Sequence, residues 1–194
     1  MAATYTWDVF ATLDGFGSFT EDGDWGGYWG KEGPEFISHR AAQYQENRRL
    51  VLGRNTFISF QRFLGDITPE SDADDPVNTR MKYIPTTVIS STLEAPLDWP
   101  DATLISGDIV DIVANLKAES DIPLVSHGSM TLNKALLDAG LIDRIQVAIF
   151  PVISGQVGCD SLFTGVTDFD LDLLSSKLFD GRIQELTYRP TLHG

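Results

Sequence analysis

Residues 50–57 read LVLGRNTF: a short apolar run, then Gly-Arg-Asn-Thr, then the start of a second apolar segment. The run is typical of a short buried strand over residues 48–53, and residues 56–64 favour a short helix. A glycine after a strand lets the backbone approach a ligand closely, and the first turn of a helix offers N–H groups with a partial positive charge. The stretch therefore predicts an anion-binding turn, or else a plain helix start whose arginine forms a surface ion pair.

An arginine at this turn contrasts with the acidity of the whole chain. The sequence has 14 basic and 28 acidic residues and a formal net charge of -14. Between residues 40 and 62, however, a single acid, Glu46, is outnumbered by five arginines: Arg40, Arg48, Arg49, Arg54 and Arg62. Because so acidic a surface repels nucleic acids and anionic lipids at long range, we expect neither as a partner. The basic segment instead predicts a small anionic ligand.

Length and composition favour a single domain over residues 1–194. A chain of 194 residues that is 42% hydrophobic can bury one sizeable core. The one cysteine, Cys159, excludes an internal disulfide and a cysteine cluster, and we expect no metal site. The N-terminus has no basic segment, Asp8 interrupts its apolar run, and no apolar run approaches the roughly 18 residues of a membrane span. We therefore expect a cytoplasmic protein.

Two further strand ends share the design of the first. In the segments VISSTL (88–93) and LVSHGSM (124–130), small polar or imidazole side chains come directly after an apolar run. These side chains are Ser90, Ser91, Thr92, His127 and Ser129. The hydroxyls of the first segment could bind a phosphate or a ribose, or form an ordinary serine-rich turn. The second segment opens a helix at Ser129, which we expect to cap it, and predicts a second anion site.

Strands and helices alternate through the middle of the chain, and residues 66–80 predict an acidic surface loop. We predict strands over residues 4–13, 48–53, 82–93, 102–107, 122–128 and 141–153, and helices over residues 35–47, 56–64, 108–120 and 129–140. Two more strands, joined by Asp180-Gly181, form a hairpin over residues 169–190. The pattern predicts a three-layer α/β domain whose mostly parallel mixed sheet ends in an antiparallel C-terminal hairpin. Since parallel strands end at one rim, the three turns should meet one elongated ligand.

The order of several segments resembles the dihydrofolate reductase superfamily. The matching segments are ATLDGF (11–16), LVLGRNTF (50–57), VISSTL (88–93) and LLDAGLIDRIQVAIFPVISGQVGCDSLF (136–163). The resemblance is greater to the branch similar to the reductase domain of the bifunctional riboflavin-biosynthesis deaminase-reductase. It implies a dihydrofolate-reductase-like fold and an NADPH-dependent oxidoreductase that acts on a small, pteridine- or aminopyrimidine-like substrate. The enzyme would resemble 5-amino-6-(5-phosphoribosylamino)uracil reductase or dihydrofolate reductase. The alternative is a non-catalytic nucleotide- or flavin-binding protein that keeps the cofactor cradle.

The resemblance also implies positions for the cofactor. Gly53, Arg54, Asn55 and Thr56 would hold the phosphates, and Ser90, Ser91 and Thr92 would surround the adenosine end and its 2′-phosphate. His127, Gly128, Ser129 and Met130 would line the pyrophosphate, and Ala11 and Gly17 would meet the nicotinamide. The family often has Gly-Gly, commonly with a cis peptide, where this chain has His127-Gly128. The branch is usually dimeric, so we expect a homodimer.

Two carboxylates are candidates for catalysis. Asp14 lies in the matching LDG segment, although Asp-Gly is also an ordinary turn. Glu35 lies where dihydrofolate reductases keep a helix carboxylate that faces the pterin, although an acid in the first turn of a helix is favourable for electrostatic reasons alone. The glycine-rich segment 14–34 is predicted to be a loop that closes as a lid over the nicotinamide end. Its Trp25, Tyr28 and Trp29 could stack on a flat heterocycle or fill a core or subunit interface.

Overall fold

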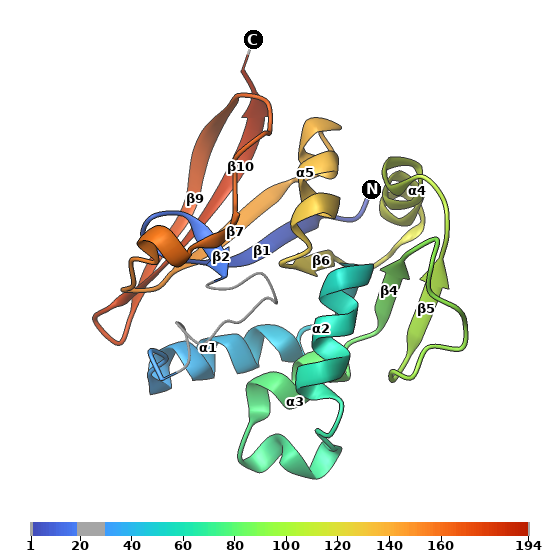
Figure 1. The fold of residues 1–194 in the computed structure, drawn as a ribbon, viewed down its shortest axis with the longest axis horizontal. Coiled ribbons are helices and arrows are strands. Elements are labelled where there is room, and N and C mark those ends of the chain that lie inside the picture. The colour runs from blue at the N-terminus through green and yellow to red at the C-terminus, as the bar shows by residue number, and fades with distance from the viewer. Residues whose placement is uncertain (1, 19–29, 194) are drawn as a thin grey trace.

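The structure, a computed structural model, describes residues 2–18 and 30–193. Its main feature is an eight-stranded sheet with the order β5-β4-β3-β6-β1-β7-β10-β9 (Figure 1). Its strands are β1 (Tyr5–Ala11), β3 (Arg49–Gly53), β4 (Thr86–Ile89), β5 (Ala102–Ile105), β6 (Leu124–His127), β7 (Arg144–Ile149), β9 (Phe169–Phe179) and β10 (Ile183–Leu192). The first six of these strands run parallel, whereas β10 is antiparallel to both β7 and β9. The predicted mixed sheet with a C-terminal hairpin is therefore confirmed.

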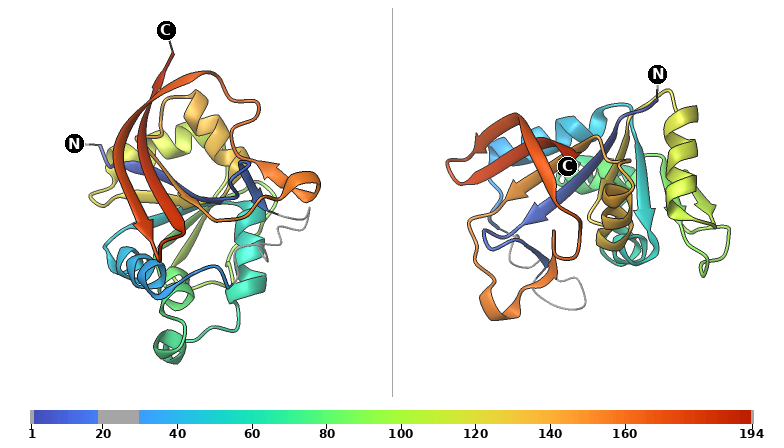
Figure 2. Two further views of the ribbon diagram at one scale, coloured as in Figure 1. Left: turned by 90° about the vertical axis from the view of Figure 1, so that its left-hand side faces the viewer. Right: turned by 90° about the horizontal axis from the view of Figure 1, so that it is seen from above.

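Helices cover both faces of the sheet and complete three layers. One face carries α4 (Ile109–Glu119) and α5 (Met130–Asp138), and the other carries α1 (Pro34–Gln45), α2 (Arg54–Leu64) and α3 (Pro76–Lys82) (Figures 1 and 2). Each face has its own apolar core. None of the helices in the described ranges is long and apolar enough to cross a membrane.

The alternation of side chains along a strand decides which of them point to each face of the sheet. On β1, Trp7 and Val9 belong to the core beneath α4 and α5. The intervening Asp8 and Phe10 point to the opposite face and contact Arg40 and Phe36 of α1. A charged residue therefore lies in the middle of a central strand, on the face that α1 covers.

Several predicted boundaries are wrong in an instructive way. Residues 66–80 are not a plain loop, because they contain the short helix η1 (Pro69–Ala73) and most of α3. Asp75 caps α3 by accepting a hydrogen bond from the Asn78 N–H at 3.1 Å, and Pro76 occupies its first position. The capping aspartate and the proline start a helix here, although the acidic composition is typical of a loop. The strand predicted from residue 82 begins only at Thr86, after the helix has ended.

A small second sheet also escaped prediction. It pairs β2 (Phe16–Ser18) with β8 (Cys159–Ser161), which follows the short helix η2 (Gly155–Val157). Both strands have three residues, too few for the alternation of side chains to be visible in the sequence. The pairing fixes β2, which contains Gly17, beside the carboxyl end of β1.

The hairpin turn at Asp180 caps helix α1. The Asp180 carboxylate accepts hydrogen bonds from the N–H groups of Glu35 (3.1 Å) and Phe36 (3.0 Å), and the Glu35 carboxylate accepts one from the Asp180 N–H (2.7 Å). Gly33, the residue before the helix, makes room for this cap, since a Cβ there would lie 2.2 Å from the Asp180 carboxyl carbon.

We expect Asp180→Gly to lower the free energy of unfolding by about 1 kcal/mol, the usual effect of losing an N-terminal cap. Glycine accepts the positive φ of 52° at this turn without strain, so the variant removes the carboxylate and keeps the turn. Urea unfolding measures the difference. Asp180→Asn, which keeps an accepting oxygen, should lose less, and equal losses for the two variants would contradict this account.

Candidate active site

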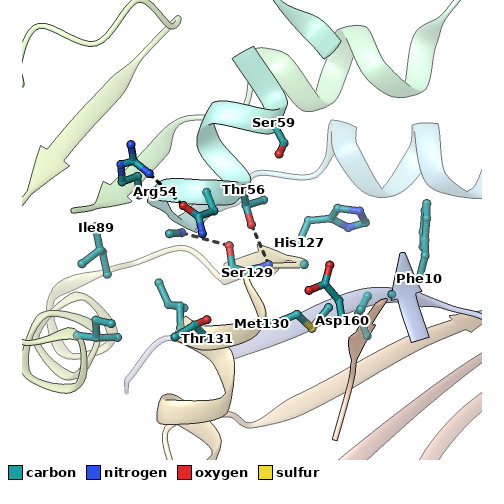
Figure 3. A pocket seen from close by; sticks show the side chains of 17 residues that line it. Phe10, Arg54, Thr56, Ser59, Ile89, His127, Ser129, Met130, Thr131 and Asp160 are labelled. Atoms are coloured by element: carbon teal, nitrogen blue, oxygen red, sulfur yellow. Dashed lines mark hydrogen bonds between the residues drawn. The ribbon is translucent and has the colours of Figure 1, made fainter. Parts of the chain in front are cut away.

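A cavity of about 480 Å³ lies at the carboxyl ends of β3 and β6, where the chain enters α2 and α5. Gly53 ends β3 directly before α2, and Gly128 and Ser129 connect β6 to α5. The two turns are joined by hydrogen bonds: the Gly53 N–H donates to Ser129 Oγ, and the Ser129 N–H donates to Thr56 Oγ1, each at 3.1 Å (Figure 3). The predicted meeting of these two turns at one rim is confirmed.

The starts of α2 and α5 differ from those of α1 and α4. Neither has a side-chain cap or an acid in its first turn. By contrast, α1 has Glu35 in its first turn, and α4 has both the cap Asp108 and the acid Asp111. Ser129 was expected to cap α5, but its hydroxyl accepts the Gly53 N–H instead. Two helix N-termini therefore present N–H groups and partial positive charge to one cavity, with Arg54 beside them.

A second cavity, of about 410 Å³, adjoins the first. Its walls are mainly apolar and aromatic and include Phe36, Tyr44, Phe60, Phe63, Leu64 and Met81. Asp74, Asp75 and Asn78 add polar groups from the start of α3. The two cavities share Phe10 and His127, whose rings meet edge to face with centroids 4.9 Å apart. The pair of cavities can hold an elongated anionic ligand next to a flat, largely apolar one.

Beneath this junction, three polar side chains form a row across neighbouring strands. His127 on β6 and Gln146 on β7 are both in register with Asp8 on β1. His127 Nδ1 lies 2.9 Å from Asp8 Oδ2, and Gln146 Nε2 donates to Asp8 Oδ1 at 3.4 Å. Arg40 of α1 donates to both Asp8 oxygens, through Nη1 at 3.0 Å and through Nη2.

The row continues to β10 and α1. Glu185 of β10 accepts from Gln146 Nε2 at 3.0 Å, lies 2.9 Å from His39 Nε2, and has Arg40 Nη1 at 3.7 Å. Asp8, Arg40 and Glu185 are each less than 5% exposed. We call the set Asp8, His39, Arg40, His127, Gln146 and Glu185 the buried polar cluster. In the described ranges, no group of three or more His, Cys, Asp or Glu side chains could hold a metal ion.

The charges of this cluster set the ionisation of its members. Burial by itself would raise the pKa of Asp8, but the positive charge of Arg40, the neighbouring His127 and the hydrogen bonds from both hold it well below its usual range. Burial raises the pKa of Tyr44, whose hydroxyl accepts from Arg40 Nη2 at 2.5 Å. Asp8 is therefore an anion at any physiological pH.

Residues 3–184 match the family model of the RibD C-terminal domain. The chain belongs to this family. Membership supports a reductase-type role in riboflavin biosynthesis, and the match covers nearly the whole chain. A search of curated protein sequences found no match.

Solved structures share the fold of this RibD C-terminal domain. A Shewanella sp. PV-4 protein attributed to riboflavin biosynthesis is 23% identical over 98% of this chain and 99% of its own, with a TM-score of 0.75. RibD from Acinetobacter baumannii is 16% identical, with a TM-score of 0.62, over 98% of this chain but 58% of its own length. Dihydrofolate reductase from Enterococcus faecalis, complexed with NADP(H) and RAB-propyl, is 14% identical over 98% and 99% of the two chains, with a TM-score of 0.59.

Most residues predicted to meet the cofactor line the first cavity of the RibD C-terminal domain. They are Gly17, Gly53, Arg54, Asn55, Thr56, His127, Gly128, Ser129 and Met130. Their role in binding stays a prediction. The peptide between His127 and Gly128 is trans, unlike the cis peptide common at the corresponding Gly-Gly of the family.

The other predicted cofactor residues lie outside the cavity lining. Ala11 is buried in the core. Ser90 Oγ accepts from the N–H groups of Thr92 and Leu93 at 3.1 and 3.2 Å, and so forms its own turn. Ser91 and Thr92 are exposed just beyond Ile89, which does line the cavity.

The basic segment of residues 40–62 does not form one basic surface. Arg49 begins β3, and Arg54 directly follows its end. The five-residue strand therefore separates the two arginines by roughly 16 Å, at about 3.3 Å per residue. Arg48 pairs with Glu46, and Arg62 lies in the last turn of α2. Arg40 is buried against Asp8. Of these five arginines, Arg54 alone lines the first cavity.

Neither predicted catalytic carboxylate is among the described residues that line the two cavities. Asp14 accepts hydrogen bonds from the Ser154 and Gly155 N–H groups at 3.1 and 2.8 Å. A hydrogen bond from Thr12 and these backbone bonds hold the pKa of Asp14 well below its usual range. Glu35 is exposed and binds the Asp180 N–H. In the structure, both carboxylates hold local backbone in place. Trp25, Tyr28, Trp29 and most of the predicted lid lie outside the described residues.

Sequence reasoning missed the buried polar cluster and the second cavity. One signal was available, since Asp8 interrupts the apolar alternation of a strand that the sequence places in the core. A charged residue at such a position requires a buried partner. The partner is Arg40, which sequence reasoning instead assigns to the basic segment of residues 40–62.

Proposed function

We propose that this chain is an NADPH-dependent reductase of a small, flat heterocycle. The first cavity holds the dinucleotide, and the second holds the substrate. The observation that carries the proposal is the convergence of two uncapped, acid-free helix N-termini and Arg54 on one cavity, in a chain with a net charge of -14. An acidic protein that arranges its backbone dipoles in this way favours an anion such as a diphosphate at that place.

The residues present fit a dinucleotide. The N–H groups at the starts of α2 and α5, with Arg54, would hold the phosphates, and Ser91 and Thr92 lie beyond Ile89 where an adenosine 2′-phosphate would extend. When bound, a reduced nicotinamide supplies a hydride. The chain itself supplies the walls: aromatic side chains of the second cavity orient a flat ring by stacking and exclude water from it. The likeness in fold to the NADP(H) complex of the Enterococcus enzyme supports this arrangement.

The proposal is tested by titrating the protein with NADPH and NADH in a calorimeter, and by following NADPH absorbance after addition of 5-amino-6-(5-phosphoribosylamino)uracil or dihydrofolate. We expect tighter binding of NADPH than of NADH, and oxidation of NADPH with one of the two compounds. Absence of NADPH binding would overturn the proposal. Binding without oxidation would favour the second candidate, a cofactor-binding protein without reductase activity, which the exclusion of Asp14 and Glu35 from both cavities supports.

We propose, further, that the chain forms a homodimer through β9. This strand is the edge of the sheet, and its outer leucines are exposed, Leu173 by 56% and Leu178 by 65%. A register shift opposite Thr187 and Tyr188 marks a bulge, which keeps Leu178 on the same face as Leu173. The result is an apolar face on an unpaired edge, a surface that proteins usually cover.

Light scattering should give a mass of about twice 21.4 kDa at micromolar concentration. Leu173→Asp should convert the protein to a monomer, because burying a carboxylate in an apolar interface is unfavourable. Lys177→Asp, on the other face of the same strand, is the matched control and should remain dimeric. A wild-type mass near that of one chain would refute the homodimer.

A further inference from the structure

The reduction proposed above requires a proton as well as a hydride, and the two carboxylates that sequence suggested for this task lie outside both cavities. We propose that His127, positioned by Asp8, is the proton donor. The inference rests on the proposed function, in that the substrate occupies the second cavity and the nicotinamide lies at its junction with the first.

His127 lies at the junction of the two cavities. Of the described residues, Phe10 and His127 line both cavities, and a phenyl ring cannot transfer a proton. The histidine is 6% exposed, its ring lies edge to face against Phe10, and Figure 3 shows it at the end of the first cavity remote from Arg54. Its Nδ1 lies 2.9 Å from Asp8 Oδ2, which fixes the ring plane. Nε2, on the other edge of the ring, is then the atom that donates.

The charge of the buried polar cluster favours a proton at this place. The carboxylates of Asp8 and Glu185 carry two negative charges, and Arg40 supplies one positive charge. A proton on His127, whose Nδ1 lies against Asp8, cancels the remainder, and buried charges require such compensation. Gln146 Nε2 donates to the carboxylates of Asp8 and Glu185, at 3.4 and 3.0 Å. The charges of these two carboxylates therefore influence each other.

Other charged residues line the cavities. Among the described residues they are Arg54 and Asp160 in the first cavity and Glu32, Asp74 and Asp75 in the second. All but Arg54 are acids, and none of them lines both cavities. Their combined field also favours positive charge at the junction.

A bound reduced dinucleotide would supply a hydride to the carbon of a C=N or C=O bond of the substrate and would so become oxidised. The π bond would break, and its electron pair would take the proton from His127 Nε2. His127 would then be a neutral imidazole whose Nδ1–H still donates to Asp8, and it would regain a proton from solvent before the next turnover.

The first test needs no substrate. The protein has three histidines, so ¹⁵N NMR of the imidazole nitrogens can resolve each of them at neutral pH. We expect both nitrogens of one ring to be protonated, with the signal absent in His127→Gln and retained in His39→Gln. Asp8→Asn should shift that ring to the neutral form. A neutral His127 in wild type, with and without NADPH, would overturn the inference even if NADPH binds and the proposed function holds.

The second test uses turnover with NADPH and 5-amino-6-(5-phosphoribosylamino)uracil or dihydrofolate. His127→Gln should lower the rate by about 10² or more, the usual contribution of a general acid, while the NADPH Kd changes by less than about threefold. Imidazole added to His127→Ala should restore part of the rate, which a merely structural role would not allow. His193→Gln is the matched control, because His193 is exposed, lies outside the buried polar cluster and lines neither cavity, and it should retain its rate. A rate for His127→Gln within about threefold of wild type would refute the donor, whereas failure of wild type to bind NADPH refutes the proposed function itself.

Discussion

Replacing Arg40 with methionine is expected to lower the free energy of unfolding by about 3–5 kcal/mol. The guanidinium is 1% exposed and donates to both oxygens of Asp8, with Glu185 at 3.7 Å. Methionine fills part of the space but leaves two buried carboxylates without their cation. The loss is therefore the cost of an uncompensated buried charge, not only the loss of one ion pair.

Urea unfolding of Arg40→Met measures this loss, and Arg189→Met is the matched control. Arg189 pairs with Asp172 at 2.8 Å, but the side chains are 61% and 62% exposed, and such pairs contribute about 0–1 kcal/mol. The double variant Asp8→Asn, Arg40→Met should recover part of the loss because it removes the carboxylate together with the cation. A loss below about 1 kcal/mol for Arg40→Met would show that the cluster does not need its arginine.

The same pair predicts a dependence on pH. The pKa of Asp8 is lowered in the folded protein, so its contribution to stability is present above the unfolded value of about 3.9 and is lost as the pH falls further. In Arg40→Met the carboxylate lacks its cation and takes up a proton more readily. The difference in stability between wild type and variant should therefore shrink as the pH falls towards about 4. A difference that stays constant from pH 7 to pH 4 would contradict this account.

Replacing Arg54 with alanine is expected to weaken NADPH binding by at least about tenfold. A charge-assisted hydrogen bond contributes about 1.5–3 kcal/mol, and each 1.4 kcal/mol is about tenfold in affinity. Arg54 is exposed, lines the first cavity, and is held by the Asn55 side chain at 3.2 Å. Because an exposed ion pair is screened, the loss should shrink at high salt.

Calorimetry with both dinucleotides locates the contact. If Arg54 binds the 2′-phosphate, NADH binding should barely change, and if it binds the diphosphate, both dinucleotides should lose affinity. Arg62→Ala is the matched control, because it removes the same charge at the other end of α2 and lines neither cavity. An unchanged affinity for both dinucleotides in Arg54→Ala would show that Arg54 does not contact the dinucleotide and is only a surface charge.

The sequence by itself determined the kind of sheet and the end of that sheet at which the turns after its parallel strands meet. Alternating apolar runs and helical periodicity predicted a mostly parallel sheet with a terminal hairpin, because these patterns depend on neighbouring residues only. Parallel strands end at one edge, so turns as distant as Gly53 and Ser129 could be placed together without coordinates. The 3.1 Å hydrogen bond between them agrees with that expectation.

Only the tertiary structure decided which charged residues belong to the site. The arginines of residues 40–62 look equivalent in sequence, yet one is buried in an ion pair and one lines the cavity, because a strand separates them and a helix turns Arg40 inward. Asp8, His127 and Gln146 are distant along the chain and meet through strand register, which no local pattern encodes. Register fixes which side chains lie side by side, and burial makes their charges depend on one another. The candidate proton donor is therefore a property of the assembled sheet.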